Sequence, residues 1–229
     1  KVPLEHEDAP VLRKYSIGEI RALLDDFGQI RIFPERFPVR SRLHGGWKGF
    51  LYNHFFVDPL DDYTAPTLQS ITTYRDVFGP DHYSFRMHDT LFIALNTPVI
   101  DHPEHVPDEW ESQLAFLTDE LAHAARSDLD HVIVIGHHPL FVAEPDEPDT
   151  YWNIPLERRK VILGLLHGAG VEIGFAGHWH RNATATDGPF TQITSGPVGY
   201  PLGDDPSGYR VVNVSPTAVD HQYLPLQES

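Results

Sequence analysis

The chain has no cysteine among its 229 residues. This absence excludes disulfide bonds, thiolate metal sites and a cysteine nucleophile, so any bound metal must be held by nitrogen and oxygen ligands. The sequence also lacks an uninterrupted apolar run of the roughly 18 residues that a membrane-spanning helix needs. Residues 1–10 are charged and contain proline, which is unlike a signal peptide. We therefore expect a soluble, cytoplasmic protein without a membrane partner.

Basic residues are scarce. The 17 Lys and Arg residues are outnumbered by 33 Asp and Glu, which gives a formal net charge of −16. Without a basic patch such a chain repels nucleic acid and anionic membrane surfaces, so we expect no nucleic-acid partner. Phosphate esters remain open as substrates, because bound metal ions can supply positive charge within a site.

The length and the 41% hydrophobic content are typical of one large domain with a full core. Residues 1–66 are predicted to form an irregular N-terminal segment with a short helix, which a capping box at Ser16 begins. Residues 67–229 are predicted to form the core. Helical and strand patterns alternate in its middle and strands dominate its end, which indicates the α/β class.

The individual elements follow from periodicity and from Gly and Pro at their ends. Helices are predicted at 67–78, from an N-cap at Asp108 along an apolar stripe to Ala125, and at 156–167. Strands are predicted at 83–87, 91–95, 131–135, 171–176, 190–194, 209–214 and 218–224.

Two histidine clusters follow two of these strands. Residues 136–139 (Gly-His-His-Pro) come after the apolar run 131–135, and residues 177–180 (Gly-His-Trp-His) come after 171–176. Loops at the carboxyl ends of parallel strands converge on one crevice, and neutral imidazole is a good ligand for Zn, Fe or Mn. We therefore expect a metal site here.

The second cluster carries two candidate ligands, His178 and His180. If the segment is extended, both side chains point to the same side and can reach one ion or two adjacent ions. The alternative is that these are hydrogen-bonded surface groups, since neighbouring pairs arise by chance among 15 histidines. The placement of both clusters after apolar strands favours the metal site.

From about Thr73 to Leu226 the chain resembles the calcineurin-like metallophosphoesterases. The resemblance rests on the following segments: Tyr-Arg-Asp-Val-Phe-Gly-Pro-Asp-His-Tyr-Ser-Phe (74–85), Leu-Phe-Ile-Ala-Leu-Asn-Thr (91–97), Gln113-Leu114 with Phe116-Leu117, Gly-His-His-Pro-Leu-Phe (136–141) and Gly-His-Trp-His-Arg-Asn (177–182). It implies that family's fold, in which two facing mixed β-sheets are flanked by helices.

The resemblance also implies a site with two divalent metal ions, Mn, Fe or Zn, that bind the phosphate and deliver a metal-bound hydroxide in line with the leaving oxygen. His137 and His178 would bind one ion and His180 the other. Asn53 would be a further metal ligand, and His54 would assist the leaving group. Arg181 and Asn182 are weaker candidates for substrate binding.

Two motifs of that family, Asp-x-His and Gly-Asp-x-x-Asp, are absent from the sequence. In the family they supply the remaining ligands of the first metal and the carboxylate that bridges both ions. We therefore expect the family's first β-α-β segment to be absent from this chain or to lie upstream of Lys1.

The leading hypothesis is a metal-dependent phosphoesterase that hydrolyses phosphate monoesters or diesters, with a small-molecule phosphate ester or a phosphoprotein as substrate. The second is a catalytically impaired or inactive metallophosphoesterase-like domain that binds a partner or ligand. The third is a mononuclear histidine-metal hydrolase or oxygenase, which one ion on three histidines would support. The sequence does not indicate an oligomeric state.

Overall fold

The computed structural model describes residues 65–198 and 201–226. These residues belong to a compact unit that runs from Thr64 to Ser229. The helix and irregular segment predicted for residues 1–66 lie almost entirely outside the described residues, as do Asn53 and His54.

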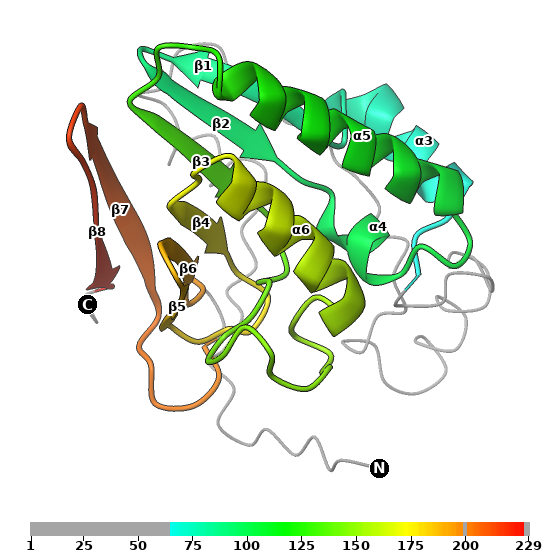
Figure 1. The fold of residues 1–229 in the computed structure, drawn as a ribbon. Helices are drawn as coiled ribbons and strands as arrows, with labels where there is room; N and C mark the ends of the chain where they lie inside the picture. Colours follow the sequence, from blue (N-terminus) through cyan, green and yellow to red (C-terminus); the bar gives the residue numbers. More distant parts are fainter. Residues whose placement is uncertain (1–64, 199–200, 227–229) are drawn as a thin grey trace, which may run out of the picture. The chain divides into compact units, whose positions relative to one another are not determined.

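A six-stranded sheet forms the centre of this unit, with the strand order β1-β2-β3-β4-β6-β5 (Figure 1). Strands β2, β3, β4 and β6 run parallel, and β1 and β5 join the two edges antiparallel. The strands are β1 (Tyr83–Met87), β2 (Thr90–Ala94), β3 (His131–Ile135), β4 (Ile173–Ala176), β5 (Ala183–Asp187) and β6 (Phe190–Thr194).

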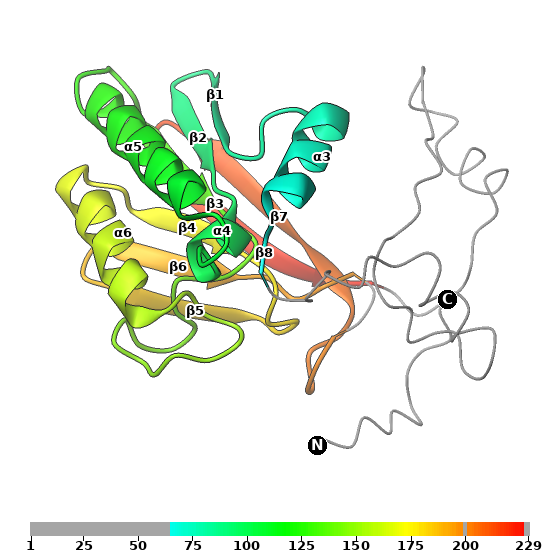
Figure 2. The same cartoon turned by 90° about the vertical axis from the view of Figure 1, so that its right-hand side faces the viewer.

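A second sheet consists of the antiparallel strands β7 (Gly208–Ser215) and β8 (Ala218–Pro225). Val219 of β8 packs against Ile133, Ile173 and Ile193 on one face of the six-stranded sheet. Helices α5 and α6 cover the other face, so the large sheet lies between the helices and the small sheet (Figure 2). The predicted α/β class, with two sheets flanked by helices, is confirmed.

The main core lies between the helices and the large sheet. Leu117 of α5 and Ile162 and Leu166 of α6 pack with Ile93 and Val134 of the sheet. The helices are α3 (Leu68–Phe78), α4 (Thr97–Asp101), α5 (Pro107–Ala124) and α6 (Leu156–Gly168). Among the described residues, none of these helices has both the length and the apolar character that crossing a membrane requires.

Helix α3 has the ends that its sequence predicts. The side chain of Thr67 accepts a hydrogen bond from the backbone N–H of Ser70, and the Ser70 hydroxyl in turn accepts one from the Thr67 N–H. This capping box satisfies two backbone donors that the first turn leaves without partners. Gly79 ends the helix with a φ of 94°, which residues with a Cβ rarely adopt.

The predicted start of α5 is wrong by two residues. Val106, not Asp108, is the N-cap, and Pro107 is the first helical residue. Proline suits this position because its missing N–H would have no partner there, and Asp108 then lies in the first turn, where the helix dipole favours a negative charge. The stripe also ends earlier, since Ala125 is an exposed C-cap.

Two elements have no strong sequence signal. Helix α4 spans only five residues and has proline in its first turn, so no helical period can develop. Strand β5 has the sequence Ala-Thr-Ala-Thr-Asp, which contains no large apolar side chain. Its place at the edge of the sheet requires only that Ala185 be buried.

Candidate metal centre

Three neighbouring parallel strands, β2, β3 and β4, end at the same edge of the large sheet. Thr97 follows the end of β2, His137 follows β3, and His178 follows β4. Since the strands are adjacent and parallel, these residues meet although they are far apart in the sequence. The convergence expected from the two histidine clusters is confirmed.

Three histidines gather at this edge. His137, His138 and His178 each place one ring nitrogen within 4.8 Å of the others. The shortest separation is 3.0 Å, between Nε2 of His137 and Nδ1 of His178. Two nitrogen ligands of one ion, at bond lengths of about 2.0–2.1 Å, lie about 2.9 Å apart at a right angle and about 3.3 Å apart at the tetrahedral angle. The pair His137 and His178 therefore fits a single ion.

The backbone carbonyl of Tyr151 determines which nitrogen of His178 can bind a metal. This oxygen lies 2.9 Å from Nε2 of His178. A carbonyl can only accept a hydrogen bond, so Nε2 carries the proton and donates it. In the neutral ring Nδ1 then carries the lone pair, which is directed at Nε2 of His137. Metal-binding histidines are commonly oriented in this way through their other nitrogen.

The loop that carries Tyr151 is held by a buried arginine. The Arg159 side chain has no exposed surface, and it donates hydrogen bonds to the carbonyl oxygens of Ile154 at 3.0 Å, Pro145 at 3.0 Å and Glu147 at 2.9 Å. Because a guanidinium group has its donors in a fixed plane, these three contacts fix the path of the loop.

Glu147 holds the same loop from the other side. Its carboxylate accepts hydrogen bonds from the backbone N–H groups of Val142, Ala143 and Glu144 and from the side chain of Asn153. Burial alone would raise the pKa of Glu147, but the hydrogen bonds from Asn153 and from the backbone outweigh it and lower the pKa. The group is therefore ionised at neutral pH and stabilises the loop as an acceptor.

Thr97 connects the end of β2 to the first histidine cluster. Its hydroxyl oxygen lies 3.1 Å from the backbone nitrogen of His137, 2.9 Å from that of His138 and 3.0 Å from Nδ1 of the His138 ring. The residue is buried, and its methyl group lies directly over Gly136. No residue with a side chain fits at position 136 without displacing Thr97.

The segment before Thr97 is held in place by side chains that form hydrogen bonds with it. Gln113 of α5 is buried, accepts a hydrogen bond from the backbone N–H of Asn96 at 2.6 Å and donates one to the Asn96 carbonyl at 3.1 Å. The side chain of Asn96 donates to Asp81, which also pairs with Arg75. These contacts hold the end of β2 from both sides.

The surroundings of His137 and His138 favour the neutral form of both rings. Burial, with the neighbouring His178, His137 and His102, lowers the pKa of His138 to about 3. Burial and the positive charges that His178 and His180 can carry also lower the pKa of His137. The neutral ring is the form that can donate a lone pair to a metal, so this electrostatic environment suits a metal site.

The second cluster does not have the extended backbone that we expected. His178 and His180 have φ angles of 61° and 57°, so the chain bends at both residues. Such left-handed conformations cost about 1–3 kcal/mol at a non-glycine residue and concentrate at functional sites. His180 lies outside the three-histidine group, although its charge acts on His137.

The residues after the second cluster have structural partners. The Arg181 guanidinium lies 5.4 Å from the centre of the Trp179 ring. The side-chain oxygen of Asn182 accepts hydrogen bonds from Arg210 at 2.7 Å and from the backbone of Gly196 at 3.1 Å. Asn182 therefore links the segment before β5 to β7, and its role in substrate binding stays a prediction.

A cavity of about 390 Å³ lies beside His137. Its walls are largely apolar and come from α3, through Ile71 and Tyr74, and from Leu95 and Pro98 after β2. Asp81 and Asn96 also line it. The cavity therefore provides apolar space next to a candidate metal ligand.

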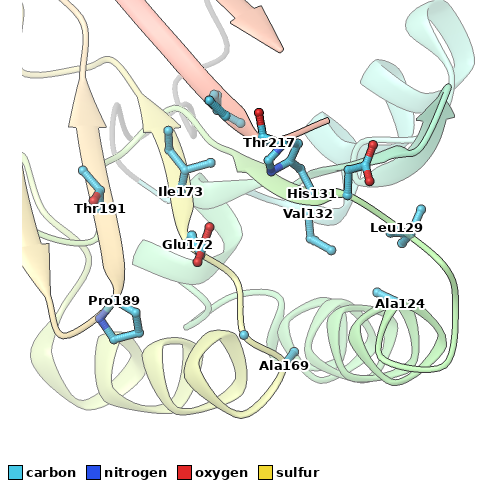
Figure 3. Close-up of a pocket in the computed structure, with 14 residues that line it drawn as sticks. Ala124, Leu129, His131, Val132, Ala169, Glu172, Ile173, Pro189, Thr191 and Thr217 are labelled. Carbon is cyan, nitrogen blue, oxygen red and sulfur yellow. The ribbon is translucent and has the colours of Figure 1, made fainter. Parts of the chain in front are cut away.

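A larger cavity, of about 490 Å³, lies at the opposite edge of the sheet (Figure 3). His131 and Val132 at the start of β3, Glu172 before β4 and Thr191 of β6 line it, with Thr217 from the turn between β7 and β8. These residues lie at the amino ends of the parallel strands, away from the histidine group. This cavity is thus separate from the metal centre.

Taken together, three histidines at the ends of adjacent parallel strands of an α/β sheet form an arrangement that can hold a metal ion. No protein-family model matches the chain. Curated relatives do match: the serine/threonine-protein phosphatase CPPED1 of Pongo abelii and that of Homo sapiens are each 34% identical over 165 residues, which cover 72% of this chain and 52% of the relative. The Danio rerio protein is 33% identical over 164 residues, 72% of this chain and 53% of its own length.

CPPED1 is the calcineurin-like phosphoesterase domain-containing protein 1, and these relatives place the chain among the calcineurin-like metallophosphoesterases. The chain spans about half the length of the relatives that it matches. The resemblance inferred from the motifs is therefore confirmed at the level of the family.

Two solved structures match part of the chain. GAP50, the anchor in the inner membrane complex of Plasmodium, matches with a TM-score of 0.48 at 18% identity, over 63% of this chain and 49% of that chain. A dimetal phosphatase from Danio rerio matches with a TM-score of 0.44 at 15% identity, over 68% of this chain and 62% of that chain. The family relationship rests on the sequence matches.

Proposed function

We propose that this chain is a metal-dependent phosphoesterase that hydrolyses phosphate monoesters, or diesters. The observation that supports this most strongly is the pair of ring nitrogens of His137 and His178, 3.0 Å apart, with the proton of His178 directed away to Tyr151. Divalent ions bound here would polarise the phosphoryl group and activate the attacking water. Mn, Fe and Zn all suit nitrogen ligands.

The protein's own contribution is to orient these ligands before a metal arrives. Tyr151 fixes the tautomer of His178, and desolvation together with His178 and His180 lowers the pKa of His137. His180, on the same bent segment as His178, is the candidate ligand of a second ion. Asn53 as a further ligand and His54 as the group that assists the leaving oxygen complete the proposal.

The substrate class is proposed from the cavity beside His137. Its apolar walls at Ile71, Tyr74 and Leu95 suit the organic part of a small phosphate ester or a side chain near a phosphorylated residue. The relatives are named serine/threonine-protein phosphatases, which favours phosphoproteins among the substrates to be tried.

An inactive, ligand-binding derivative is the second candidate. Two observations favour it: the sequence contains neither Asp-x-His nor Gly-Asp-x-x-Asp, and the metal-ligand group found among the described residues consists of histidines alone. A site without carboxylates leaves the positive charge of two divalent ions uncompensated. The second ion is then bound more weakly than the first.

The test is hydrolysis of p-nitrophenyl phosphate and of bis-p-nitrophenyl phosphate by the full chain with added Mn²⁺ or Zn²⁺. We expect metal-dependent turnover that His178→Ala reduces at least 100-fold. His123→Ala, which removes an exposed histidine of α5, is the matched control and should leave turnover unchanged. Metal binding without turnover would favour the ligand-binding derivative, and the absence of both would contradict the proposal.

A further inference from the structure

The three-histidine group raises the question whether His138 is itself a metal ligand. Its ring lies 4.1 Å from that of His178, centre to centre, and close enough for a single ion on three histidines. Such an ion would support the mononuclear alternative among the hypotheses for this chain. The hydrogen bonds of Thr97 determine which nitrogen of His138 carries its proton.

The hydroxyl oxygen of Thr97 has three polar neighbours. Two are the backbone N–H groups of His137 and His138, which can only donate. Together they occupy both lone pairs of the oxygen. The third neighbour is Nδ1 of the His138 ring at 3.0 Å, and only the hydroxyl proton remains for this contact. Thr97 therefore donates to Nδ1 of His138.

This direction fixes the His138 ring. A neutral imidazole that accepts at Nδ1 carries its proton at Nε2, and a protonated nitrogen has no lone pair for a metal. Among the described residues, the carboxylate oxygen of Asp101 lies 4.0 Å from Nε2, which is too far for a hydrogen bond. Nδ1 of His138 is thus occupied and its Nε2 carries the proton, whereas Nδ1 of His178, which the contact with Tyr151 leaves unprotonated, directs its lone pair at His137.

We propose that His138 is not a metal ligand but a positioning residue, which together with Thr97 holds the backbone of His137 so that the His137 ring faces His178. This inference rests on the proposed function only for the identity of the ligand that His137 and His178 share. Thr97 is the central group, since one hydroxyl connects the backbone nitrogens of both residues of the first cluster.

The proposal predicts different Zn²⁺ affinities for variants of similar side-chain shape. In His138→Asn the amide oxygen can take the place of Nδ1 as acceptor, while nothing replaces Nε2. We expect this variant to bind Zn²⁺ within about threefold of the wild type, whereas His137→Ala should lose at least 100-fold. Thr97→Val removes the hydroxyl at nearly constant volume and should weaken Zn²⁺ binding by about 10- to 100-fold, the usual effect of losing an outer partner of a metal ligand. Thr97→Ser keeps the hydroxyl and should restore most of the affinity.

The deciding measurement is the ring-nitrogen NMR spectrum of the full chain, labelled with ¹⁵N at histidine, before and after addition of Zn²⁺. In the metal-free protein His138 should show the tautomer with the proton at Nε2, which tests the hydrogen-bond assignment independently of any metal. On addition of Zn²⁺ the signals of His137 and His178 should shift and those of His138 should not.

A proton at Nδ1 of His138, a metal-induced shift of its ring, or a loss of affinity in His138→Asn as large as that in His137→Ala would overturn the inference. Failure of the proposed function would look different. In that case the rings of His137 and His178 would not respond to Zn²⁺ at all, while the metal-free tautomer of His138 would still be as stated.

Discussion

The Nε2 atom of His137 lies 3.0 Å from the Nδ1 atom of His178, although the two residues are 41 positions apart in the sequence. Their contact follows from the topology, because β3 and β4 are adjacent, parallel and end at the same edge. Gly136, Thr97 and the loop that carries Tyr151 hold the two rings in this position.

Gly136, the residue before His137, packs tightly against the methyl group of Thr97. A Cβ at position 136 would lie 2.6 Å from the methyl carbon of Thr97. We expect Gly136→Ala to destabilise the protein by about 1–3 kcal/mol, as overpacking typically does, and to weaken metal binding. The double variant Gly136→Ala with Thr97→Ser removes the opposing methyl group and should recover most of the loss. Urea unfolding with a Zn²⁺ titration measures both effects.

Gly164→Ala serves as the control for this prediction. Gly164 lies inside α6, and an added Cβ there meets no atom within 4 Å. Alanine is the better helix former, so this change should stabilise the protein by about 0.5–1 kcal/mol. If Thr97→Ser fails to rescue Gly136→Ala, the methyl contact is not the cause of the loss.

Arg159 and the loop that carries Tyr151 provide the second prediction. Replacement of Arg159 by Met removes three hydrogen bonds and leaves the partly buried carbonyl oxygens of Pro145 and Glu147 without this donor. We expect a loss of about 2–5 kcal/mol in the free energy of unfolding, and weaker Zn²⁺ binding because Tyr151 no longer orients His178. Lys160→Met, at an exposed neighbouring position, should change neither quantity. Unaltered Zn²⁺ binding in Arg159→Met would separate the loop from the metal centre.

The fold could be predicted further than the site. Strands β3 and β6 have β-branched or aromatic residues bounded by turn residues, so their bounds were predicted to the residue. Strand β5 and helix α4 could not be predicted, since neither has a periodic apolar pattern. Pairing also decides where a strand begins: β4 starts at Ile173 and not at Val171, because the ladder with β3 begins there.

The site, too, could be predicted only in part from the sequence. His137 and His178 could be found because an imidazole after a buried strand has a chemical meaning in the sequence itself. The carbonyl of Tyr151 could not, since every residue has a carbonyl and only the folded loop brings this one to His178. Nothing in the sequence distinguishes Thr97 from other threonines. Only the fold brings its hydroxyl to the backbone of His137 and His138.

The pH dependence of stability should reveal Glu147. Its pKa is lowered in the folded protein from the ordinary value of 4.5, so the folded state binds fewer protons than the unfolded state once the pH falls to that value. The stabilisation is therefore fully present above pH 4.5 and is lost as the pH drops through the lower pKa of the folded state.

The measurement is urea unfolding of the metal-free protein at a series of pH values. We expect the free energy of unfolding to fall less steeply with acid in Glu147→Gln than in the wild type. Glu111→Gln, at an exposed position of α5, should keep the wild-type slope. Equal slopes in the wild type and in Glu147→Gln would contradict the assignment of this carboxylate as the loop's acceptor.

Tyr74 at the cavity beside His137 tests the proposed substrate class. If the organic part of the ester contacts this ring, Tyr74→Ala should raise KM for p-nitrophenyl phosphate by roughly threefold to tenfold, an effect of about 1 kcal/mol, and leave kcat nearly constant. Tyr74→Phe retains the ring and should behave like the wild type. A change in kcat alone, with KM constant, would place the substrate elsewhere.

The central claim is that His137 and His178 bind a divalent metal ion, and a calorimetric titration tests it most directly. The wild-type chain, His178→Ala and His123→Ala are each titrated with Zn²⁺ and then with Mn²⁺. The account predicts saturable binding of at least one ion to the wild type and to His123→Ala, and its loss in His178→Ala. Absence of binding in the wild type, or unchanged binding in His178→Ala, would contradict it.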